Sequence, residues 1–428
     1  MAAAYDQLRT TVLGILETRV LDSGDLDGLV ALIDDQIDKY QRTADPGFGT
    51  EPLTDPEAVR ERLVRSIRGS GPLAAALANR RVREISGDDD DLTCRMSDGT
   101  LQPIDEPTSA DEVYEVIQRI VTDAGAEINE THPGVNGLRV KLPSGRLGRL
   151  SASVAPRIDG KISFVLRIPE QRNMVLKDWV DLGSITQPAA NLLHVVARTR
   201  TSMAIAGPPG AGKTSLLSAM IRASGDIRTI LLEENREISA PIIDGAKWAT
   251  STAESMYDLV VSTKTASPEL VIEGEFQGDE AWELTKVANI GASLWCAIHS
   301  KSASEAINAV AFAAKGAPEA AGMSVFELLQ RFATLLDVVV YVDREDNDSA
   351  RYYRRKPLQR VTEISVHSAQ PSALGVTLQP IFIRDDLESP LRWTEVELPE
   401  VLQRRFDLVL RRHGLRTIDL LQGAAIQF

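Results

Sequence analysis

The sequence predicts an α/β protein in which a parallel-sheet domain follows a smaller α+β domain and N-terminal helices. Two observations support this class. After Asp178, helix-like stretches alternate with short apolar runs, which is typical of a parallel sheet covered by helices. Between Leu73 and Leu176, β-like runs mix with a helix in a less regular order. Because 428 residues exceed the usual span of one hydrophobic core, two or three domains are expected.

Composition and charge place the chain among soluble proteins. Hydrophobic residues make up 43% and charged residues 25% of the chain, which is ordinary for such proteins. The net charge of −14 argues against broad affinity for nucleic acid or for an anionic membrane surface. We therefore expect no direct nucleic-acid binding, and association with a membrane only through protein partners.

We expect a cytoplasmic location, because the sequence shows no recognisable targeting or membrane-spanning segment and has only two, widely separated cysteines. No apolar run approaches the ~20 residues that span a bilayer, and the N-terminus shows no apolar signal core. Cys94 and Cys296 stand far apart without metal-ligand spacing, so neither a disulfide framework nor a zinc site is predicted.

Residues 1–50 are expected to form a helical segment with a linker. Apolar residues recur at helical spacing over 2–40, which predicts two amphipathic helices that separate near Ser23 and Gly24. Glycine and proline over 43–54 predict the linker. The apolar stripe of the helices is expected to pack within the subunit, and docking of a partner is the alternative.

Residues 51–178 are expected to form the α+β domain. A helix is predicted over 56–68 and another over 110–124. The run Pro143-Ser-Gly-Arg146 predicts a hairpin turn between two strands. The predicted strands of this domain are 138–142, 150–154 and 162–168.

Residues 179–428 are expected to form the parallel-sheet domain. Its predicted parallel strands are 203–206, 229–232, 270–272, 294–298 and 338–342. Strands over 360–366 and 376–383 are expected to follow, and a helix over 398–413 closes the chain.

A glycine-rich loop stands between the first of these strands and a helix-like stretch over 215–223. In this order, successive backbone N–H groups wrap a pyrophosphate at the positive end of the helix. Lys213 would reach the β- and γ-phosphates, and the Thr214 hydroxyl would ligate Mg²⁺. A chance match among 29 glycines is the alternative, which the strand–loop–helix context argues against. The expected nucleotide-binding residues are Gly207, Pro208, Pro209, Gly210, Ala211, Gly212, Lys213, Thr214 and Ser215.

Three other predicted strands end in polar residues. Glu233 and Glu234 follow one strand, the run Glu273-Gly-Glu275 ends a second, and His299 ends a third. Because the carboxyl ends of parallel strands share one edge, we expect these groups to gather beside the loop. Carboxylates there hold Mg²⁺ or polarise the attacking water, and a histidine can sense a γ-phosphate. The alternative for each group is a solvated surface position.

In combination, the loop, the acidic pair, the Glu-Gly-Glu strand and the Ala297-Ile-His299 strand resemble the secretion ATPases of the type II and type IV superfamily. Within it the chain is most similar to the CpaF-like ATPases of tight-adherence pili, with the VirB11-like ATPases next. Further matching segments are Gly71-Pro-Leu73, Val82 to Ile85, Pro143-Ser-Gly145, Arg149, Pro156, Phe164 to Arg167 and Arg360 to Ile364.

The resemblance implies a homohexameric ring whose subunits hinge an N-terminal domain to a RecA-like motor. ATP and Mg²⁺ would bind between the two domains beside a neighbouring subunit. Inner-membrane platform proteins would be the partners, at the cytoplasmic face of that membrane. The roles implied are Lys213 on phosphate, Thr214 and Glu275 on Mg²⁺, Glu275 as the Walker B glutamate, Glu233 and Glu234 as the acidic box, His299 as the His-box residue, and Arg149 and Arg167 as stabilisers of phosphate charge. The alternative for each arginine is a salt bridge on a strand surface.

The chain departs from the family pattern around the same site. The acidic box usually reads Glu-Asp, whereas Glu234 stands here. Thr265 and Ser267 replace arginines, and Gln277 replaces another. One residue and a histidine are missing before His299. Because neither hydroxyls nor an amide reproduce the bidentate guanidinium fork, two explanations stay open: a motor that uses other cations, or a subunit that binds nucleotide and hydrolyses it slowly.

The expected function is that of a hexameric ATPase that powers pilus assembly or protein secretion. One alternative is an ATPase of conjugation or effector export. The other is a nucleotide-binding assembly subunit with weak hydrolysis.

Overall fold

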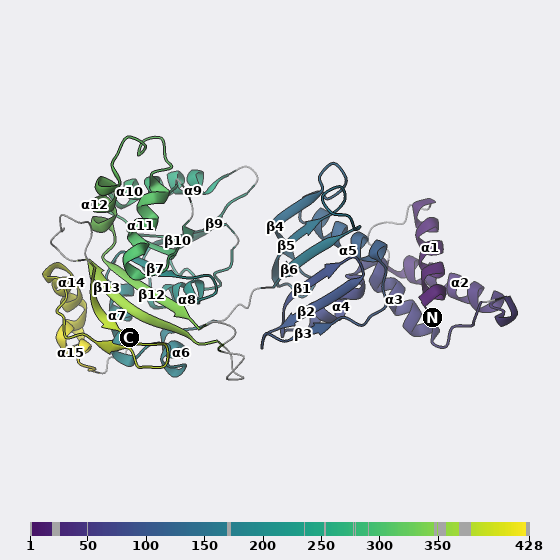
Figure 1. Ribbon diagram of the computed structural model, residues 1–428, viewed down its shortest axis with the longest axis horizontal. Coiled ribbons are helices and arrows are strands. Elements are labelled where there is room, and N and C mark those ends of the chain that lie inside the picture. Colours follow the sequence, from purple (N-terminus) through teal and green to yellow (C-terminus); the bar gives the residue numbers. More distant parts are fainter. Residues whose placement is uncertain are drawn as a thin grey trace. The chain divides into compact units, whose positions relative to one another are not determined.

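The computed structural model divides into two compact units, Met1–Glu170 and Gln171–Phe428 (Figure 1). It describes residues 2–18, 26–48, 50–168, 173–234, 236–251, 254–276, 278, 280–289, 291–345, 349, 357–367 and 378–424. The expected helix break at Ser23 and Gly24, and the substituted position Gln277, lie outside these residues.

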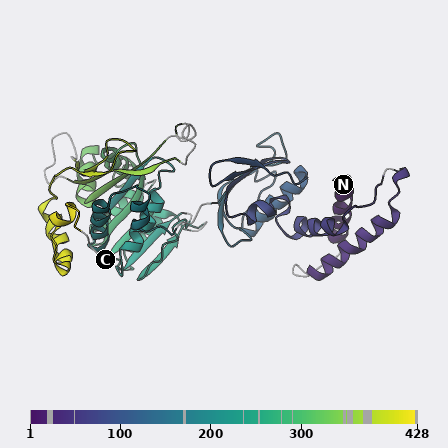
Figure 2. The ribbon, with the colours of Figure 1, turned by 90° about the horizontal axis from the view of Figure 1, so that it is seen from below.

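Unit 1 begins with helices that pack against one another (Figure 2). They are α1 (Ala2–Thr18), α2 (Leu26–Thr43), η1 (Pro46–Phe48) and α3 (Pro56–Arg68). Asp55 caps α3, because its side chain accepts a hydrogen bond from the Ala58 N–H. Leu8, Val12, Leu29 and Ile33 lie in one buried cluster with α3 residues. The predicted packing of the apolar stripe within the subunit is therefore confirmed.

The rest of unit 1 is an antiparallel sheet with a helix on one face. The sheet order is β3-β2-β1-β6-β5-β4, and α5 contributes Val113, Val116 and Ile117 to the core beneath it. The hairpin predicted at 143–146 joins β4 to β5. The elements are η2 (Gly71–Leu73), α4 (Ala74–Ala78), β1 (Val82–Asp88), β2 (Asp91–Met96), β3 (Leu101–Pro103), α5 (Ala110–Asp123), β4 (Gly134–Lys141), β5 (Leu147–Ser153) and β6 (Ser163–Arg167).

Strands β1 to β3 were not predicted, because their charged residues and the Asp88–Asp91 run obscure the alternation of apolar side chains. In the structure β2 does alternate, because Leu92, Cys94 and Met96 face the core, whereas the register of β1 is irregular between Val82 and Glu84, so Val82 and Ile85 both face the core.

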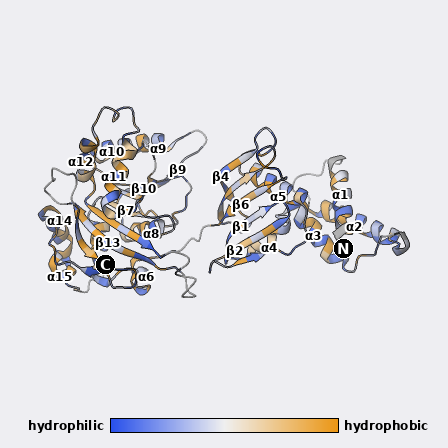
Figure 3. Cartoon of the chain, viewed as in Figure 1, coloured by the Kyte–Doolittle hydropathy of each residue, from blue (hydrophilic) through white to orange (hydrophobic). Residues whose placement is uncertain are grey.

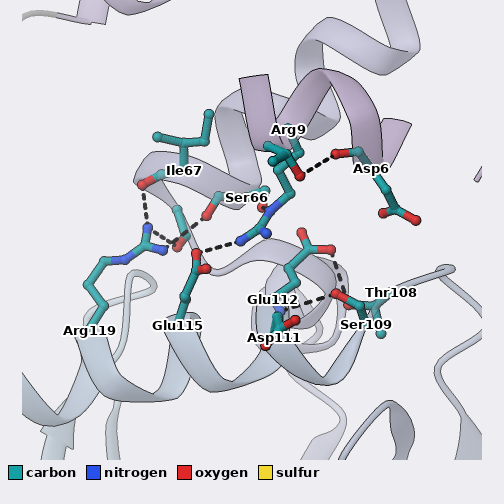
Figure 4. A network of polar contacts seen from close by, with 12 residues as sticks. Asp6, Arg9, Ser66, Ile67, Thr108, Ser109, Asp111, Glu112, Glu115 and Arg119 are labelled. Atoms are coloured by element: carbon teal, nitrogen blue, oxygen red, sulfur yellow. Dashed lines mark hydrogen bonds and ion pairs between the residues drawn. The ribbon is translucent and has the colours of Figure 1, made fainter. Parts of the chain in front are cut away.

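A network of polar contacts joins the N-terminal helices to α5 (Figure 4). The Arg9 guanidinium donates to Ser66 Oγ at 2.9 Å and to Glu115 Oε2 at 2.5 Å. Tyr5 donates its hydroxyl to Glu112 Oε1 at 2.9 Å. Arg119 donates to the backbone oxygens of Ser66, Ile67 and Gly69. The network fixes the N-terminal helices to the α+β part of unit 1.

Unit 2 is a parallel sheet extended by antiparallel strands. The order is β15-β14-β13-β12-β7-β11-β10-β8-β9, parallel from β12 to β9 and antiparallel from β12 to β15. The strands are β7 (Met203–Gly207), β8 (Thr229–Glu233), β9 (Gly245–Ala249), β10 (Leu270–Phe276), β11 (Ser293–His299), β12 (Val338–Arg344), β13 (Gln359–His367), β14 (Leu378–Ile383) and β15 (Arg392–Trp393). The predicted α/β class with a RecA-like parallel sheet is confirmed.

Helices cover both faces of this sheet, whose central strands are largely hydrophobic (Figure 3). Residues of α6, α7, α8, α14 and α15 share one core with one face, and residues of α9 to α12 share a second core with the other. The helices are α6 (Leu176–Asp181), α7 (Gln187–Arg198), α8 (Lys213–Ala223), α9 (Met256–Thr263), α10 (Glu280–Asn289), α11 (Ala303–Ala314), α12 (Val325–Leu335), α14 (Glu400–Leu410), η3 (Arg411–His413) and α15 (Thr417–Leu421).

Unit 2 differs from the predicted elements at one edge of its sheet and at its C-terminal helix. Edge strand β9 was missed because its sequence, Gly-Ala-Lys-Trp-Ala, has little apolar character. The closing helix predicted over 398–413 ends earlier, and α15 follows it after Gly414, which adopts a left-handed conformation at φ 69°. No helix within the described ranges has both the length and the apolar character to cross a membrane.

Candidate active site

The strand order brings the predicted polar strand ends to one edge. Strand β11 lies between β7 and β10, and β8 lies on the other side of β10. His299 is opposite Gly207 in the β11–β7 register. The glycine-rich loop and the ends of β11, β10 and β8 are therefore consecutive along the sheet.

Glycines shape the backbone of the loop. A Cβ on Gly207 would lie 2.0 Å from the Val342 carbonyl oxygen, so strand β12 leaves no room for a side chain there. Gly210 and Gly212 have φ values of 73° and 102°, which favour glycine. Helix α8 begins immediately afterwards at Lys213. Its first N–H groups have no partners inside the helix and form a binding place for an anion.

Lys213 is buried at the centre of this site, with 7% of its surface exposed. Its Nζ donates to the carbonyl oxygens of Gly207 at 3.0 Å and Pro208 at 3.1 Å. Burial lowers the pKa of Lys213, and the charge of Glu275 opposes that effect. The loop carbonyl oxygens thus hold the buried Lys213 side chain at the start of α8.

His299 links Lys213 to Glu275. Its Nδ1 is 3.1 Å from Lys213 Nζ, and its Nε2 is 2.7 Å from Glu275 Oε1. An ammonium can only donate, so Nδ1 accepts and Nε2 carries the hydrogen that Glu275 accepts. Three of the predicted site residues therefore form one chain of hydrogen bonds across three strands.

The predicted acidic box divides between interior and surface. Glu233 is 4% exposed, and its Oε1 accepts a hydrogen bond from the Ile238 N–H at 2.8 Å. Its Oε2 has no partner among the described residues. Burial raises the pKa of Glu233. The adjacent Glu234 is exposed, so the two carboxylates have different environments.

Glu273 has an unusual position that the sequence did not reveal. The side chain is fully buried, and neither carboxyl oxygen has a hydrogen-bond partner among the described residues. Burial holds its pKa well above the usual range, and the neighbouring charges of Glu280 and Glu234 add to the effect. Sequence reasoning grouped Glu273 with Glu275 because both flank Gly274, whereas only Glu275 contacts His299.

Thr265 and Ser267, which were named above as departures from the family pattern, lie in a local turn. Thr265 Oγ1 donates to the Ser262 carbonyl oxygen at 2.9 Å, and Ser267 adopts a left-handed φ of 50°. Both lie in the connection between α9 and β10.

Arg344 and Gln359 contact the loop and were not predicted as site residues. Arg344 Nη1 lies 3.4 Å from the Pro209 carbonyl oxygen, and Gln359 Nε2 donates to the Gly210 carbonyl oxygen at 2.7 Å. The rule that parallel strands share an edge would have pointed to Arg344, because this residue ends β12 beside β7.

The two candidate arginines of unit 1 are neighbours on its sheet. Arg149 of β5 is directly opposite Arg167 of β6. Arg167 Nε lies 3.3 Å from Glu84 Oε2, which is the strand-surface salt bridge named above as the alternative. Their proposed action on phosphate is a separate question from this geometry.

The residues of the loop fit a nucleotide triphosphate with Mg²⁺. The loop glycines adopt a backbone that leads directly into the N-terminus of α8, where the first N–H groups have no partners inside the helix, and the buried Lys213 ammonium lies at the same place. Thr214 and Glu275 would hold the metal, which neutralises charge on the phosphates when bound. The half-exposed Glu275 carboxylate is available for that role.

Comparisons with known proteins identify the family of the chain. The family model described as "Type II/IV secretion system protein" matches residues 86–328. A probable conjugal transfer protein TrbB of Sinorhizobium fredii is 28% identical over 254 residues, 58% of this chain and 76% of the relative. VirB11 of Rhizobium radiobacter is 24% identical over 262 residues, 53% of this chain and 76% of the relative. The ATPase DotB of Legionella pneumophila aligns in structure with a TM-score of 0.49 at 16% identity, over 68% of this chain and 78% of DotB.

Proposed function

The chain belongs to the type II/IV secretion system protein family, and from this premise we propose that it is a homohexameric ATPase motor that powers pilus assembly or protein secretion. One observation carries the proposal. The loop lysine, the strand-end histidine and the strand-end carboxylate form the continuous chain Lys213–His299–Glu275 at the edge where nucleotides bind in parallel sheets.

Each group has a role that its position supports. Lys213 would bind the β- and γ-phosphates, and the loop N–H groups would surround them. Thr214 and Glu275 would hold Mg²⁺, and Glu233 and Glu234 would orient the attacking water. His299 would report the presence of the γ-phosphate, because it already contacts the lysine that binds this group. Arg149 and Arg167 would stabilise phosphate charge from the N-terminal unit.

The cellular setting follows from the family. We place the ring at the cytoplasmic face of an inner membrane, bound to platform proteins of a pilus or secretion system. Within the family, the residue patterns favour the tight-adherence pilus branch.

A second function is favoured by the relatives themselves. The TrbB relative carries conjugal transfer in its name, so a motor for conjugation or effector export is the alternative. Neighbouring genes distinguish the two: prepilin and platform genes accompany a pilus motor, whereas relaxase and coupling-protein genes accompany a conjugation motor.

Hydrolysis is the decisive measurement for the motor. Purified, assembled protein with Mg²⁺-ATP should release phosphate well above a Lys213→Ala variant. Lys177→Ala is a matched control, because Lys177 is exposed and pairs only with Asp181 on α6. If the unmodified protein releases no more phosphate than Lys213→Ala, the motor proposal is wrong. Tight ATP binding without turnover would then support an assembly subunit.

A further inference from the structure

The second question about this site is which positively charged side chain besides Lys213 could act at the phosphates. In the part of unit 2 that the structure describes, a second cation besides Lys213 contacts the loop. This cation is Arg344, at the end of strand β12.

Strand pairing delivers Arg344 to the loop. Strand β12 runs parallel to β7, with Tyr341 opposite Ala206. The Val342 carbonyl oxygen packs directly on Gly207. Arg344 is two residues further along the same strand, so its side chain reaches the middle of the loop.

The loop is shaped to receive this guanidinium. A Cβ built on Gly210 would lie 2.5 Å from Arg344 Nη1. Any side chain at position 210 would therefore displace the arginine, in addition to straining a backbone at φ 73°. Gly210 is needed both for the turn and for the approach of Arg344.

Gln359 completes the arrangement from the neighbouring strand. It is directly opposite Arg344 in the β12–β13 register, and it donates to the Gly210 carbonyl oxygen at 2.7 Å. Arg344 contacts the preceding carbonyl, that of Pro209, at 3.4 Å. Arg344 and Gln359 thus contact two consecutive carbonyl groups of the loop, Arg344 at 3.4 Å and Gln359 at 2.7 Å.

From this geometry we propose that Arg344 is a catalytic cation that contacts the γ-phosphate of a nucleoside triphosphate in the same subunit. The inference rests on the proposed ATPase function. A guanidinium makes shorter, charge-assisted bonds to phosphate than the 3.4 Å contact of Arg344 with a neutral carbonyl. Gln359 is a positioning residue that keeps the loop in place.

The chemistry requires no proton from Arg344. The oxygen of water bonds to the γ-phosphorus while the bond from that phosphorus to the bridging oxygen breaks. The electron pair stays with ADP, and one proton is released to solvent. Arg344 stays protonated and stabilises the negative charge of the group in transfer.

The test compares Arg344→Gln with Arg344→Lys and with Arg392→Gln, which removes an exposed arginine paired with Asp385 on the β15 edge. We expect Arg344→Gln to lower kcat by about 10³-fold, as loss of an arginine finger does. The affinity for a non-hydrolysable ATP analogue should fall by about ten-fold, while that for ADP is unchanged, because only the analogue carries the γ-phosphate. Arg392→Gln should behave as the unmodified protein.

Other results would overturn the assignment. Equal losses of ADP and analogue affinity would show that Arg344 only braces the loop, and an unchanged kcat would exclude it from catalysis. If Arg344→Gln does not fold, Arg344→Lys provides the same measurements of kcat and nucleotide affinity, because it keeps the charge but not the guanidinium fork. Full activity of Arg344→Lys would contradict the proposal. If the unmodified protein is no more active than Lys213→Ala, the ATPase function is refuted. The ratio of the affinities for the ATP analogue and for ADP would still test whether Arg344 contacts the γ-phosphate.

Discussion

The two units bury charged side chains in opposite ways. In unit 1, Arg9 contacts Ser66 and Glu115, and the buried Glu112 accepts from Tyr5 and Thr108. In unit 2, the buried Glu233 and Glu273 leave carboxyl oxygens without partners among the described residues. The buried charged groups of the unit 1 network have internal partners, whereas these two carboxylates of unit 2 have unpaired oxygens among the described residues.

The difference separates groups that hold the fold from groups that await a ligand. A network whose members are all satisfied rigidifies the structure, whereas an unsatisfied buried group costs stability and persists where function requires it. The unit 1 network therefore serves to attach the N-terminal helices. The buried carboxylates of unit 2 lie on β8 and β10, in the sheet that carries the loop, and have a net cost to folding.

The largest effect should separate function from stability. Lys213→Ala should lower hydrolysis by about 10²–10³-fold. Its thermal midpoint should change little, because removal of a desolvated ammonium offsets the three lost hydrogen bonds. Phosphate release and a thermal melt of the full chain measure both. A strongly lowered midpoint would place Lys213 with the structural groups.

The second effect concerns unit 1 alone. Glu112→Ala should destabilise the attachment of α1 by about 3 kcal/mol, because Arg62 and the Tyr5 hydroxyl lose a buried partner. Hydrogen exchange of peptides from α1 and α5 in the full chain reports this local opening. Glu57→Ala is the control, since its exposed pair with Arg60 should contribute almost nothing. Equal exchange in both variants would mean that the network is not structural.

The third effect has the opposite sign. Glu273→Leu should stabilise the protein by about 1–2 kcal/mol near pH 8, because a buried carboxyl without a partner is removed. Its raised folded-state pKa means that the native state retains a proton that the unfolded chain releases. Wild-type stability therefore falls as pH rises above the ordinary glutamate range, and the gain from the substitution should shrink toward pH 4.5, the ordinary pKa of a glutamate side chain. Denaturation at several pH values measures it, and a loss of stability at pH 8 would reveal a partner.

The smallest effect tests a buried carboxylate in unit 2 that does have partners. Glu283 is bonded by Lys264 and Lys286. Burial alone would raise its pKa, but these two ammonium groups outweigh burial and hold the pKa below the usual range. Glu283→Gln should cost about 0.5–1 kcal/mol at neutral pH, discounted for the partial exposure of both lysines. This stabilisation is lost as pH falls through the lowered pKa, so a cost that persists at acid pH would contradict the pairing.

The sequence predicted most of the fold because hydrophobic pattern and loop chemistry are local. The strand–loop–helix unit at 203–223 and five of the six parallel strands were predicted within a few residues, and so was helix α3. The strands that were not predicted, β1 to β3, β9 and β15, carry many polar residues or lack β-branched and large aliphatic side chains, so their pairing depends on neighbours distant in the sequence.

The site was predictable in its membership but not in its contacts. The rule that parallel strands share an edge predicted that Lys213, His299 and Glu275 lie close together. It did not distinguish Glu275 from the buried Glu273. An irregularity in the β10–β11 register between Glu273 and Phe276 separates them. Such a bulge, like the reach of Arg344 from β12, depends on strand register, which one sequence does not reveal.

The placement of β11 between β7 and β10 has a consequence for the order of events at the site. His299 satisfies Lys213 on one side and Glu275 on the other. A phosphate that draws the lysine away leaves the imidazole with a changed set of partners, and the carboxylate feels that change through a single ring. Under the proposed function, in which Glu275 would hold Mg²⁺, nucleotide binding at Lys213 would therefore alter the hydrogen bond of that carboxylate, and we expect nucleotide and metal to bind as a pair rather than in sequence.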